Sequence, residues 1–178
     1  MLDASDHELM ARLRNEDHAA FTGLMQRYQR PLANYFRRVG ASTDVEDLVQ
    51  ETFLRVYRYR LKYRPQARFT TFLYTLARNA WFDSLRRKRT QDRVAERVRG
   101  EHPPPPRSVV GPTDAPGLDA TQALSGLDER LREIVVLTVM QGLSYSEAAD
   151  ILRIPVGTVK SRMFAALHEL RRRFHEDK

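Results

Sequence analysis

The sequence predicts an all-α protein made of two small helical domains joined by a proline-rich linker, with a helix-turn-helix in the second domain. Apolar residues recur at three- and four-residue spacing on both sides of residues 98–119, and no stretch alternates apolar and polar residues as a strand does. Four consecutive prolines, Pro103 to Pro106, lie inside that segment and exclude a helix there. Residues 143–173 have the pattern of two helices separated by a very short turn.

The first domain contains three predicted helices. One covers Phe21 to Phe36, whose apolar residues share a face, and Pro31 is expected to kink it or to begin a new segment. A second begins in the TDVE stretch, where Thr43 is expected to cap the helix and Glu46 to reach back as the capping-box partner. The third runs from about Phe69 to Leu85.

A linker separates this domain from the next. We assign residues 1–92 to the first domain, 93–118 to the linker and 119–178 to the second domain. The consecutive prolines favour an extended polyproline conformation, which provides reach but little burial. We therefore expect the two domains to be separately mobile until a partner fixes them. The second domain begins with predicted helices over about 122–126 and 128–141.

The helix-turn-helix follows directly. Ser144 and Glu147 form a second capping box, which predicts that a helix begins at about Tyr145. Arg153 to Pro155 form the turn, because proline disfavours helical geometry at the residue before it and can itself begin a helix. The predicted buried stripe of the second helix is Val159, Met163, Ala166, Leu167, Leu170 and Phe174.

The outward face of that second helix is the candidate DNA-reading surface. The second helix of such a pair can enter the major groove and read base edges with its N-terminal residues. Ser161 points away from the buried stripe, with Lys160 and Arg162 on its flanks. Phe164 lies about 100° from the centre of the stripe, where it is suited to contact a thymine methyl group. The alternative is an ordinary helical hairpin with a solvated basic face.

The composition favours a polyanionic partner. The 178 residues (20.7 kDa) carry 30 Lys+Arg against 23 Asp+Glu, a formal net charge of +7, and the pI is about 10.0. Nucleic acid is the favoured polyanionic partner, and an anionic membrane surface is the alternative. The chain has no cysteine, which excludes disulfides and thiolate metal sites, and no segment approaches the ~20 apolar residues that span a bilayer. We expect a cytoplasmic protein with no membrane contact of its own.

Residues 43–58 form a helix with an acidic face. The side chains opposite its apolar stripe are Asp47, Gln50, Glu51 and Leu54, with Asp44 one turn earlier. These acids would repel DNA, so the face is expected to meet a basic protein surface. The alternative is a solvated charged face. Acid–base catalysis is not expected, because nothing indicates a closed pocket or a third chemical group.

Basic and aromatic residues alternate in residues 57–89. Basic side chains can follow a nucleic-acid backbone and aromatic rings can stack on exposed bases, so the segment is typical of a surface for unpaired nucleic acid. The rings are Tyr57, Tyr59, Tyr63, Phe69, Phe72, Tyr74, Trp81 and Phe82. The alternative is that most of them lie in the core and the arginines extend along it.

Three stretches, in this order, carry a family resemblance: DVEDLVQETFLRVYR, TFLYTLARNAWFDSLRRKR and LSYSEAADILRIPVGTVKSR. They resemble the bacterial extracytoplasmic-function (ECF) sigma factors, and the resemblance spans nearly the whole chain apart from the linker. In that family an N-terminal helical domain binds RNA polymerase and the minus-ten promoter element, and a C-terminal helix-turn-helix domain binds the minus-thirty-five element. The resemblance implies promoter recognition, promoter melting and transcription initiation. The implied partners are core RNA polymerase (β′ and β subunits), promoter DNA and an anti-sigma factor.

The resemblance also implies roles for individual residues. The polymerase-binding set is Asp44, Asp47, Gln50, Glu51 and Leu54. The minus-ten set is Tyr63, Arg68, Asn79, Arg86, Arg87 and Lys88, and the minus-thirty-five set is Thr158, Lys160, Ser161, Arg162 and Phe164. Two positions depart from the family pattern: Phe72 stands where members often have tryptophan in a TWL triplet, and Ala165 stands where they often have a basic residue.

Two other functional classes compete with this interpretation. A freestanding helix-turn-helix transcription activator would account for the C-terminal domain alone and leave the acidic helix and the aromatic-basic segment without a purpose. An enzyme acting on nucleic acid is disfavoured, because the five histidines are scattered and have no carboxylate partners at metal-ligand spacing. We therefore expect no enzymatic activity, no bound metal and no cofactor.

Overall fold

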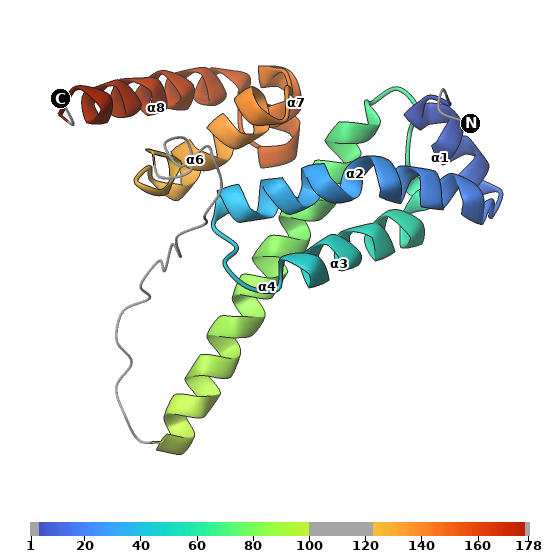
Figure 1. The fold of residues 1–178 in the computed structure, drawn as a ribbon, viewed down its shortest axis with the longest axis horizontal. Helices are drawn as coiled ribbons and strands as arrows, with labels where there is room; N and C mark the ends of the chain where they lie inside the picture. Colours follow the sequence, from blue (N-terminus) through green and yellow to red (C-terminus); the bar gives the residue numbers. More distant parts are fainter. Residues whose placement is uncertain (1–3, 100–122, 177–178) are drawn as a thin grey trace.

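Every regular element in residues 4–99 and 123–176, the part of the chain that the computed structural model describes, is a helix. In chain order the elements are α1 (Asp6–Arg14), α2 (His18–Val39), α3 (Val45–Arg58), the short 3-10 helix η1 (Arg60–Lys62), α4 (Phe69–Arg99), α6 (Glu129–Val135), the π-helical turn η2 (Val136–Met140), α7 (Tyr145–Leu152) and α8 (Val156–Glu176). Figure 1 shows α1 to α4 as one group and α6 to α8 as a second, smaller group. The predicted all-α class is confirmed.

The first group of helices encloses an aromatic core. Tyr35, Phe36, Phe53 and Leu73 come from α2, α3 and α4, and all four are at most 2% exposed. Each of these helices buries one face, as the three- and four-residue spacing predicts. The short helix α1, which lies outside the predicted set, begins at a capping box in which the Ser5 hydroxyl accepts from the Glu8 amide.

One predicted helix boundary in this group is absent and another is wrong. No new segment begins at Pro31, because α2 continues through it as one helix and buries its apolar face on both sides, which outweighs the hydrogen bond that proline cannot donate. Thr43 does not cap α3. The N-cap is Asp44, which has a left-handed backbone (φ 61°) and makes no side-chain capping bond. Glu46 instead pairs with Arg37 of α2 at 3.4 Å.

α4 is longer than predicted. It continues beyond Leu85 and through residue 92 to Arg99, and its second half extends away from the other helices (Figure 1). The rest of the predicted linker, residues 100–118 with its four prolines, lies outside the described residues.

The second group packs α6 and α7 against α8. Its core includes Ile134, Leu137, Ala148 and Val159, all fully buried. The helix predicted over 128–141 corresponds to α6 and η2, which run on continuously. Of the helix predicted over 122–126, residues 123–125 are helical and residue 122 lies outside the described part.

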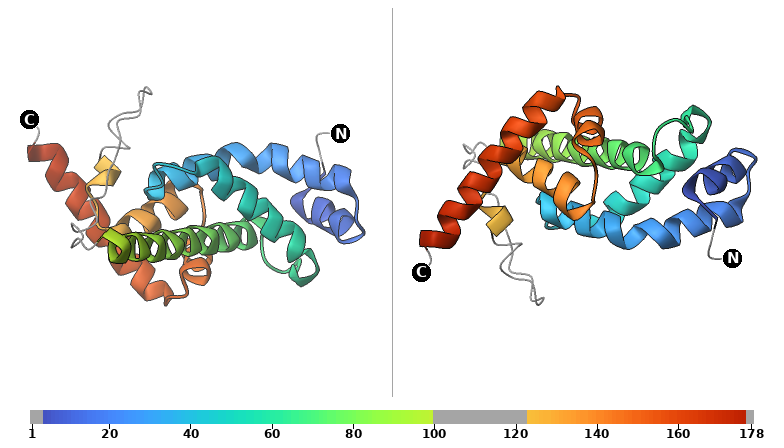
Figure 2. Two further views of the ribbon diagram at one scale, coloured as in Figure 1. Left: turned by 90° about the horizontal axis from the view of Figure 1, so that it is seen from below. Right: turned by 90° about the horizontal axis from the view of Figure 1, so that it is seen from above.

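The two groups of helices touch each other. α7 packs on the first half of α4, and α6 and η2 pack on α2, so the C-terminal helices lie against the N-terminal ones in all three views (Figures 1 and 2). The sequence-based expectation of two separately mobile domains did not include this contact. The residues that make it are described below.

Candidate functional site

The helix-turn-helix has the predicted geometry. The Ser144 hydroxyl accepts from the Glu147 amide at 3.2 Å, and the Glu147 carboxylate accepts from the Ser144 amide at 2.8 Å, which confirms the capping box. Partial burial raises the pKa of Glu147, but the Ser144 hydrogen bonds outweigh it and the pKa lies below its usual value. Arg153 ends α7 in the left-handed conformation (φ 55°), and the Pro155 carbonyl accepts the first hydrogen bonds of α8.

α8 presents the predicted face to solvent. Phe164 is 75% exposed, whereas Val159 and Met163, on the opposite side of the helix, are buried. Lys160 and Ser161 are exposed, and Thr158 and Arg162 are half-buried beside them. Phe164 also borders an open hollow lined by Ala165, His168, Glu169 and Arg172. Leu167, predicted to be buried, is 44% exposed.

Some residues on the acidic face of α3 form ion pairs within the protein and others do not. Asp47 and Gln50 are exposed and have no hydrogen-bond or ion-pair partner among the described residues. Leu54, on the same face, is 55% exposed. Glu51 differs, because its carboxylate accepts from Arg55 at 2.7 Å, and Arg55 also binds Asp83 of α4 at 2.9 Å.

Asp44 is also engaged. Its carboxylate lies 2.9 Å from the Lys88 ammonium, and hydrogen bonds from Lys88 and Thr43 lower the pKa of Asp44. Asp44 and Glu51 therefore connect α3 to the rest of the fold, whereas Asp47, Gln50 and Leu54 remain available to a partner.

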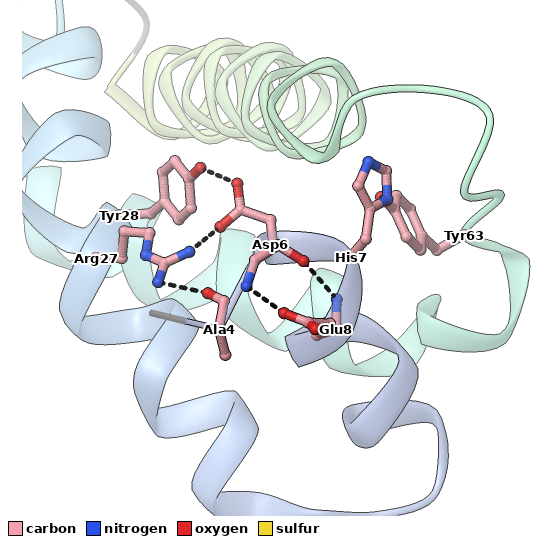
Figure 3. A network of polar contacts seen from close by, with 8 residues as sticks. Ala4, Asp6, His7, Glu8, Arg27, Tyr28 and Tyr63 are labelled. Atoms are coloured by element: carbon pink, nitrogen blue, oxygen red, sulfur yellow. Dashed lines mark hydrogen bonds and ion pairs between the residues drawn. The ribbon is translucent and has the colours of Figure 1, made fainter. Parts of the chain in front are cut away.

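Tyr63 lies inside the protein. Its ring is 4% exposed and packs against Phe69 and Phe72, and its hydroxyl is 2.6 Å from Nδ1 of His7 in α1. Figure 3 shows His7 and Tyr63 side by side, next to the network in which Asp6 binds Arg27 and Tyr28. A ring held in this way cannot stack on a base, so the predicted direct contact of Tyr63 with DNA does not fit this arrangement.

Most of the other rings in residues 57–89 belong to the core too. Phe69, Tyr74 and Trp81 are buried, and the remaining rings of the segment are half-buried. The spacing of aromatic and basic residues fitted an exposed stacking surface, but two of the arginines cover rings: Arg60 lies 4.3 Å from the centre of the Tyr57 ring, and Arg78 lies 4.5 Å from that of Phe82. The alternative core interpretation is correct for these rings.

The polar members of the minus-ten set lie along α4. Arg68, which directly precedes the helix, is exposed, and Asn79 is half-buried. Arg86, Arg87 and Lys88 are exposed and lie beyond the middle of α4, where Lys88 still reaches the start of α3. Arg86 binds Asp83 at 3.7 Å, and Lys88 binds Asp44 and Thr43.

A polar contact between the two groups of helices was missed from sequence. Nε of Arg78 in α4 donates to Glu133 of α6 at 2.7 Å, the Tyr74 hydroxyl donates to Gln141, and Glu147 accepts from Thr71. Burial raises the pKa of Glu133, and Arg78 opposes that shift. The signal was present in the stretch LREIVVLTVM, where Glu133 directly precedes the apolar residues Ile134 to Leu137. A charge in such a place needs a partner, but the sequence does not say which one.

Residues 4–99 and 123–176 contain neither a metal-binding cluster nor a membrane-spanning helix. No three His, Cys, Asp or Glu side chains in these residues gather to hold a metal ion. No helix within them is both long and apolar enough to cross a bilayer.

Comparison with known proteins relates both groups of helices to sigma factors. The family model of sigma-70 region 2 matches residues 24–91, and that of sigma-70 region 4 matches residues 118–170. The fold and these two matches define a sigma-70-type sigma factor, in which α2 to α4 belong to region 2 and α6 to α8 to region 4. The match to region 2 overturns the alternative of a freestanding activator, which would need region 4 only.

Relatives narrow the class further. The ECF RNA polymerase sigma-E factor of Haemophilus influenzae is 31% identical over 175 residues, with 91% of each chain covered. The ECF RNA polymerase sigma-E factor of Escherichia coli K12 is 34% identical over 185 residues, covering 91% of this chain and 90% of the other. The chain belongs to the ECF sigma factors. It directs promoter recognition and transcription initiation.

Solved structures agree with the fold. CnrH, solved in complex with the cytosolic domain of CnrY, superposes with a TM-score of 0.72 at 27% identity and covers 98% of this chain and 100% of its own. The Bartonella quintana sigma factor RpoE, solved with the anti-sigma factor NepR, gives a TM-score of 0.68 at 24% identity, covering 89% of this chain and 98% of its own. Both matches extend over the two groups of helices together.

Proposed function

We propose that the chain docks on core RNA polymerase through Asp47, Gln50 and Leu54 of α3. The observation that carries this proposal is Leu54, an apolar side chain 55% exposed between unpaired polar groups. Such a pattern is typical of a protein interface, where an apolar anchor is desolvated and the surrounding charges select the partner. The partner surface is basic and, by family resemblance, belongs to the β′ subunit, with the β subunit as the second contact. Asp44 and Glu51 are engaged by Lys88 and Arg55 and are not counted among the docking contacts.

The same domain is proposed to hold the minus-ten element. Asn79 offers both a donor and an acceptor, which reading the edge of a flipped base requires. Arg68 supplies charge at the start of α4, and Arg86, Arg87 and Lys88 supply it beyond the middle of the helix. These side chains can bind phosphates, for which Arg86 would leave Asp83 and Lys88 would leave Asp44. Tyr63 contributes by bracing the loop before α4 through Phe69 and Phe72.

α8 is proposed to read the minus-thirty-five element. Phe164 and Ser161 are placed to touch base edges, while Lys160 and Arg162 are placed to reach phosphates or guanine. Thr158 lies in the first turn of α8, where its hydroxyl can contact the DNA backbone. The resemblance also favours an anti-sigma factor as regulator, a cytoplasmic location and no catalytic activity.

Core-polymerase binding of two α3 variants, one with a reversed charge and one with a truncated apolar side chain, tests the docking proposal. Asp47→Lys and Leu54→Ala should each weaken binding by about tenfold, as the loss of an interface anchor typically does. Asp92→Lys makes the same charge change at an exposed position of α4 outside the proposed face and should bind like the parent. Parent-like binding of both α3 variants would show that the docking face lies elsewhere. Transcription from a promoter library with purified core enzyme, with and without the chain, tests the function as a whole.

A further inference from the structure

The loop that leads into α4, residues 63–68, is exposed between two buried rings. Residues 64–68 are exposed, whereas Tyr63 at the start of the loop is 4% exposed and Phe69, which follows the loop, is 2% exposed. The centres of these two rings lie 6.1 Å apart. An exposed segment that is fixed at both ends takes its position from the residues that hold those ends. The contacts of Tyr63 and Phe69 therefore decide how the loop is presented to a partner.

α1 holds the first ring. Nδ1 of His7 lies 2.6 Å from the Tyr63 hydroxyl, and the two ring centres are 5.9 Å apart (Figure 3). The same hydroxyl donates to the Ala67 carbonyl at 3.4 Å. A phenol has one proton, so while it donates to Ala67 it accepts from the Nδ1–H group of His7. Through Tyr63, His7 therefore acts on the loop near both of its ends.

The second ring is held through the same turn of α1. The centre of the Phe69 ring is 5.2 Å from that of Tyr28 in α2, and the Tyr28 hydroxyl donates to Asp6, the residue before His7. Burial and this hydrogen bond raise the pKa of Tyr28, so its hydroxyl stays protonated and remains a donor. Arg27 also binds Asp6 (Figure 3). The contacts of both rings therefore lead back to the first turn of α1.

α1 is fixed to the rest of the first domain and can serve as a support. On its inner face Leu9, Met10 and Leu13 are at most 7% exposed. Glu16, which lies just after the helix, pairs at 3.2 Å with Arg60 of η1, shortly before the loop. α1 lies outside residues 24–91, which the region 2 model matches. The support of the loop therefore comes from a part of the chain that this match does not include.

We infer that α1 positions the loop for the minus-ten element, with His7 as the positioning residue. When the bond between His7 and Tyr63 is lost, the loop and Arg68 at its end sample more positions, so the domain discriminates less between minus-ten bases. The docking face of α3 is unaffected. The inference rests on the minus-ten function proposed for Arg68 and Asn79.

Transcription from a promoter library that is randomised in the minus-ten element and has a fixed minus-thirty-five element measures this preference. Core polymerase is loaded with each variant of the full chain. Tyr63→Phe keeps the ring and removes the hydroxyl, and His7→Ala removes its partner. Each should lower the preference for the best minus-ten base by about fivefold, the factor that the loss of one ordinary hydrogen bond gives. Parent-like preference in both variants overturns the inference.

Two further variants separate positioning from a direct contact of His7 with DNA, which its exposure allows. His7→Asn carries an amide that can donate to the Tyr63 hydroxyl and should restore most of the preference. The double variant of His7→Ala with Tyr63→Phe should match the single variants, because both remove the same hydrogen bond. Losses that add in the double variant would mean that His7 acts without Tyr63, and the positioning role would be excluded.

Arg12→Ala is the control for a general loss of stability in α1. It removes the ion pair between Arg12 and Asp17 at the other end of the helix. Urea unfolding should show a loss of stability in this control, while its minus-ten preference should equal that of the parent. Binding to core polymerase should be parent-like in every variant. A control with the same reduced preference as His7→Ala would show that the effect is loss of stability alone and would overturn the inference.

Asn79→Ala, measured beside these variants, separates the inference from the proposed function. If Asn79→Ala changes the minus-ten preference and the His7 and Tyr63 variants do not, the role of α1 is overturned and the minus-ten proposal stands. If the His7 and Tyr63 variants change it and Asn79→Ala does not, the loop reads the element, the inference stands and the role of Asn79 is wrong. If none of these variants changes it, both fail.

Discussion

Ser144 and Glu147 begin α7 with two reciprocal hydrogen bonds, and both hydrogen bonds can be predicted from the sequence alone. A serine followed three residues later by a glutamate satisfies two backbone amides that would otherwise have no partner. These are local interactions, so a few adjacent residues determine them. The exposure of Phe164 can also be predicted from neighbouring residues, because the helical period fixes its position relative to the buried apolar stripe of α8.

Loss of the Ser144 cap should destabilise the chain measurably. Ser144→Ala leaves the Glu147 amide without its acceptor and should lower the free energy of unfolding by ~1 kcal/mol. Ser146→Ala is the matched control, since Ser146 is exposed inside α7 and alanine favours a helix there. Urea unfolding of both variants measures the difference. Equal stabilities would mean that the cap contributes nothing.

Asp17 should make stability depend on pH. Hydrogen bonds from Arg12 and from the Ala20 amide, with a smaller one from the Ala19 amide, lower the pKa of Asp17 below 3.8. A carboxyl with a lowered pKa in the folded state stabilises the protein above its unfolded pKa, and this stabilisation is lost as the pH falls through the folded value.

Asp17→Asn keeps a cap acceptor but does not titrate. The parent should therefore be more stable than Asp17→Asn at pH 7, and the difference should shrink as the pH falls below about 4. Urea unfolding at several pH values checks this. A difference that stays constant down to pH 3 would exclude Asp17 as the source. Added salt should reduce the difference in stability between the parent and Asp17→Asn at pH 7. The reason is that the side chains of Arg12 and Asp17 are both partly exposed, so salt screens their attraction.

At the scale of the element, the helical period predicted which residues of each helix face inward, and most helix bodies were found where it placed them. It did not predict where helices end. α2 continues through Pro31 because its apolar face is buried on both sides. α4 continues to Arg99, with exposed side chains over residues 86–95, because no glycine or proline stops it between Leu85 and Arg99. The sequence left open whether the rings around Tyr63 lie on the surface or in the core, because a segment rich in arginine and aromatic residues fits both, and the structure places most of them in the core.

Substitutions in α8 should affect base contacts and phosphate contacts separately. Phe164→Ala should relax sequence preference at one position by ~1 to 3 kcal/mol with little change in salt dependence. Lys160→Ala should weaken all sequences alike and reduce the salt slope by about 1. His168→Ala, exposed further along α8, serves as control. Binding of a randomised upstream element at several salt concentrations measures both effects. The assignment fails if Phe164→Ala and Lys160→Ala give the same profile.

At the scale of the whole molecule, the contact between region 2 and region 4 should survive a cut in the linker. The proline-rich composition of residues 100–118 predicts tryptic cleavage between about Arg99 and Asp119. The two fragments should then elute together on size exclusion, because Arg78–Glu133 and the apolar packing of α7 on α4 hold them. Glu133→Lys should release the fragments. Separate elution of the parent fragments would show that the contact between region 2 and region 4 is too weak to hold them together.

By itself, the sequence determined the helical class, the division into two regions, the family and the outward face of α8, because these depend on periodicity, capping residues and motifs that lie within one element. The tertiary structure alone decided that Tyr63 is internal, that Glu51 and Asp44 are tied to Arg55 and Lys88, and that Glu133 pairs with Arg78. Each of these depends on which distant residue comes to lie opposite, and that is set by how helix faces pack together. The sequence can show that a buried acid needs a partner, but only the packing of the two groups of helices brings Arg78 of α4 to Glu133 of α6.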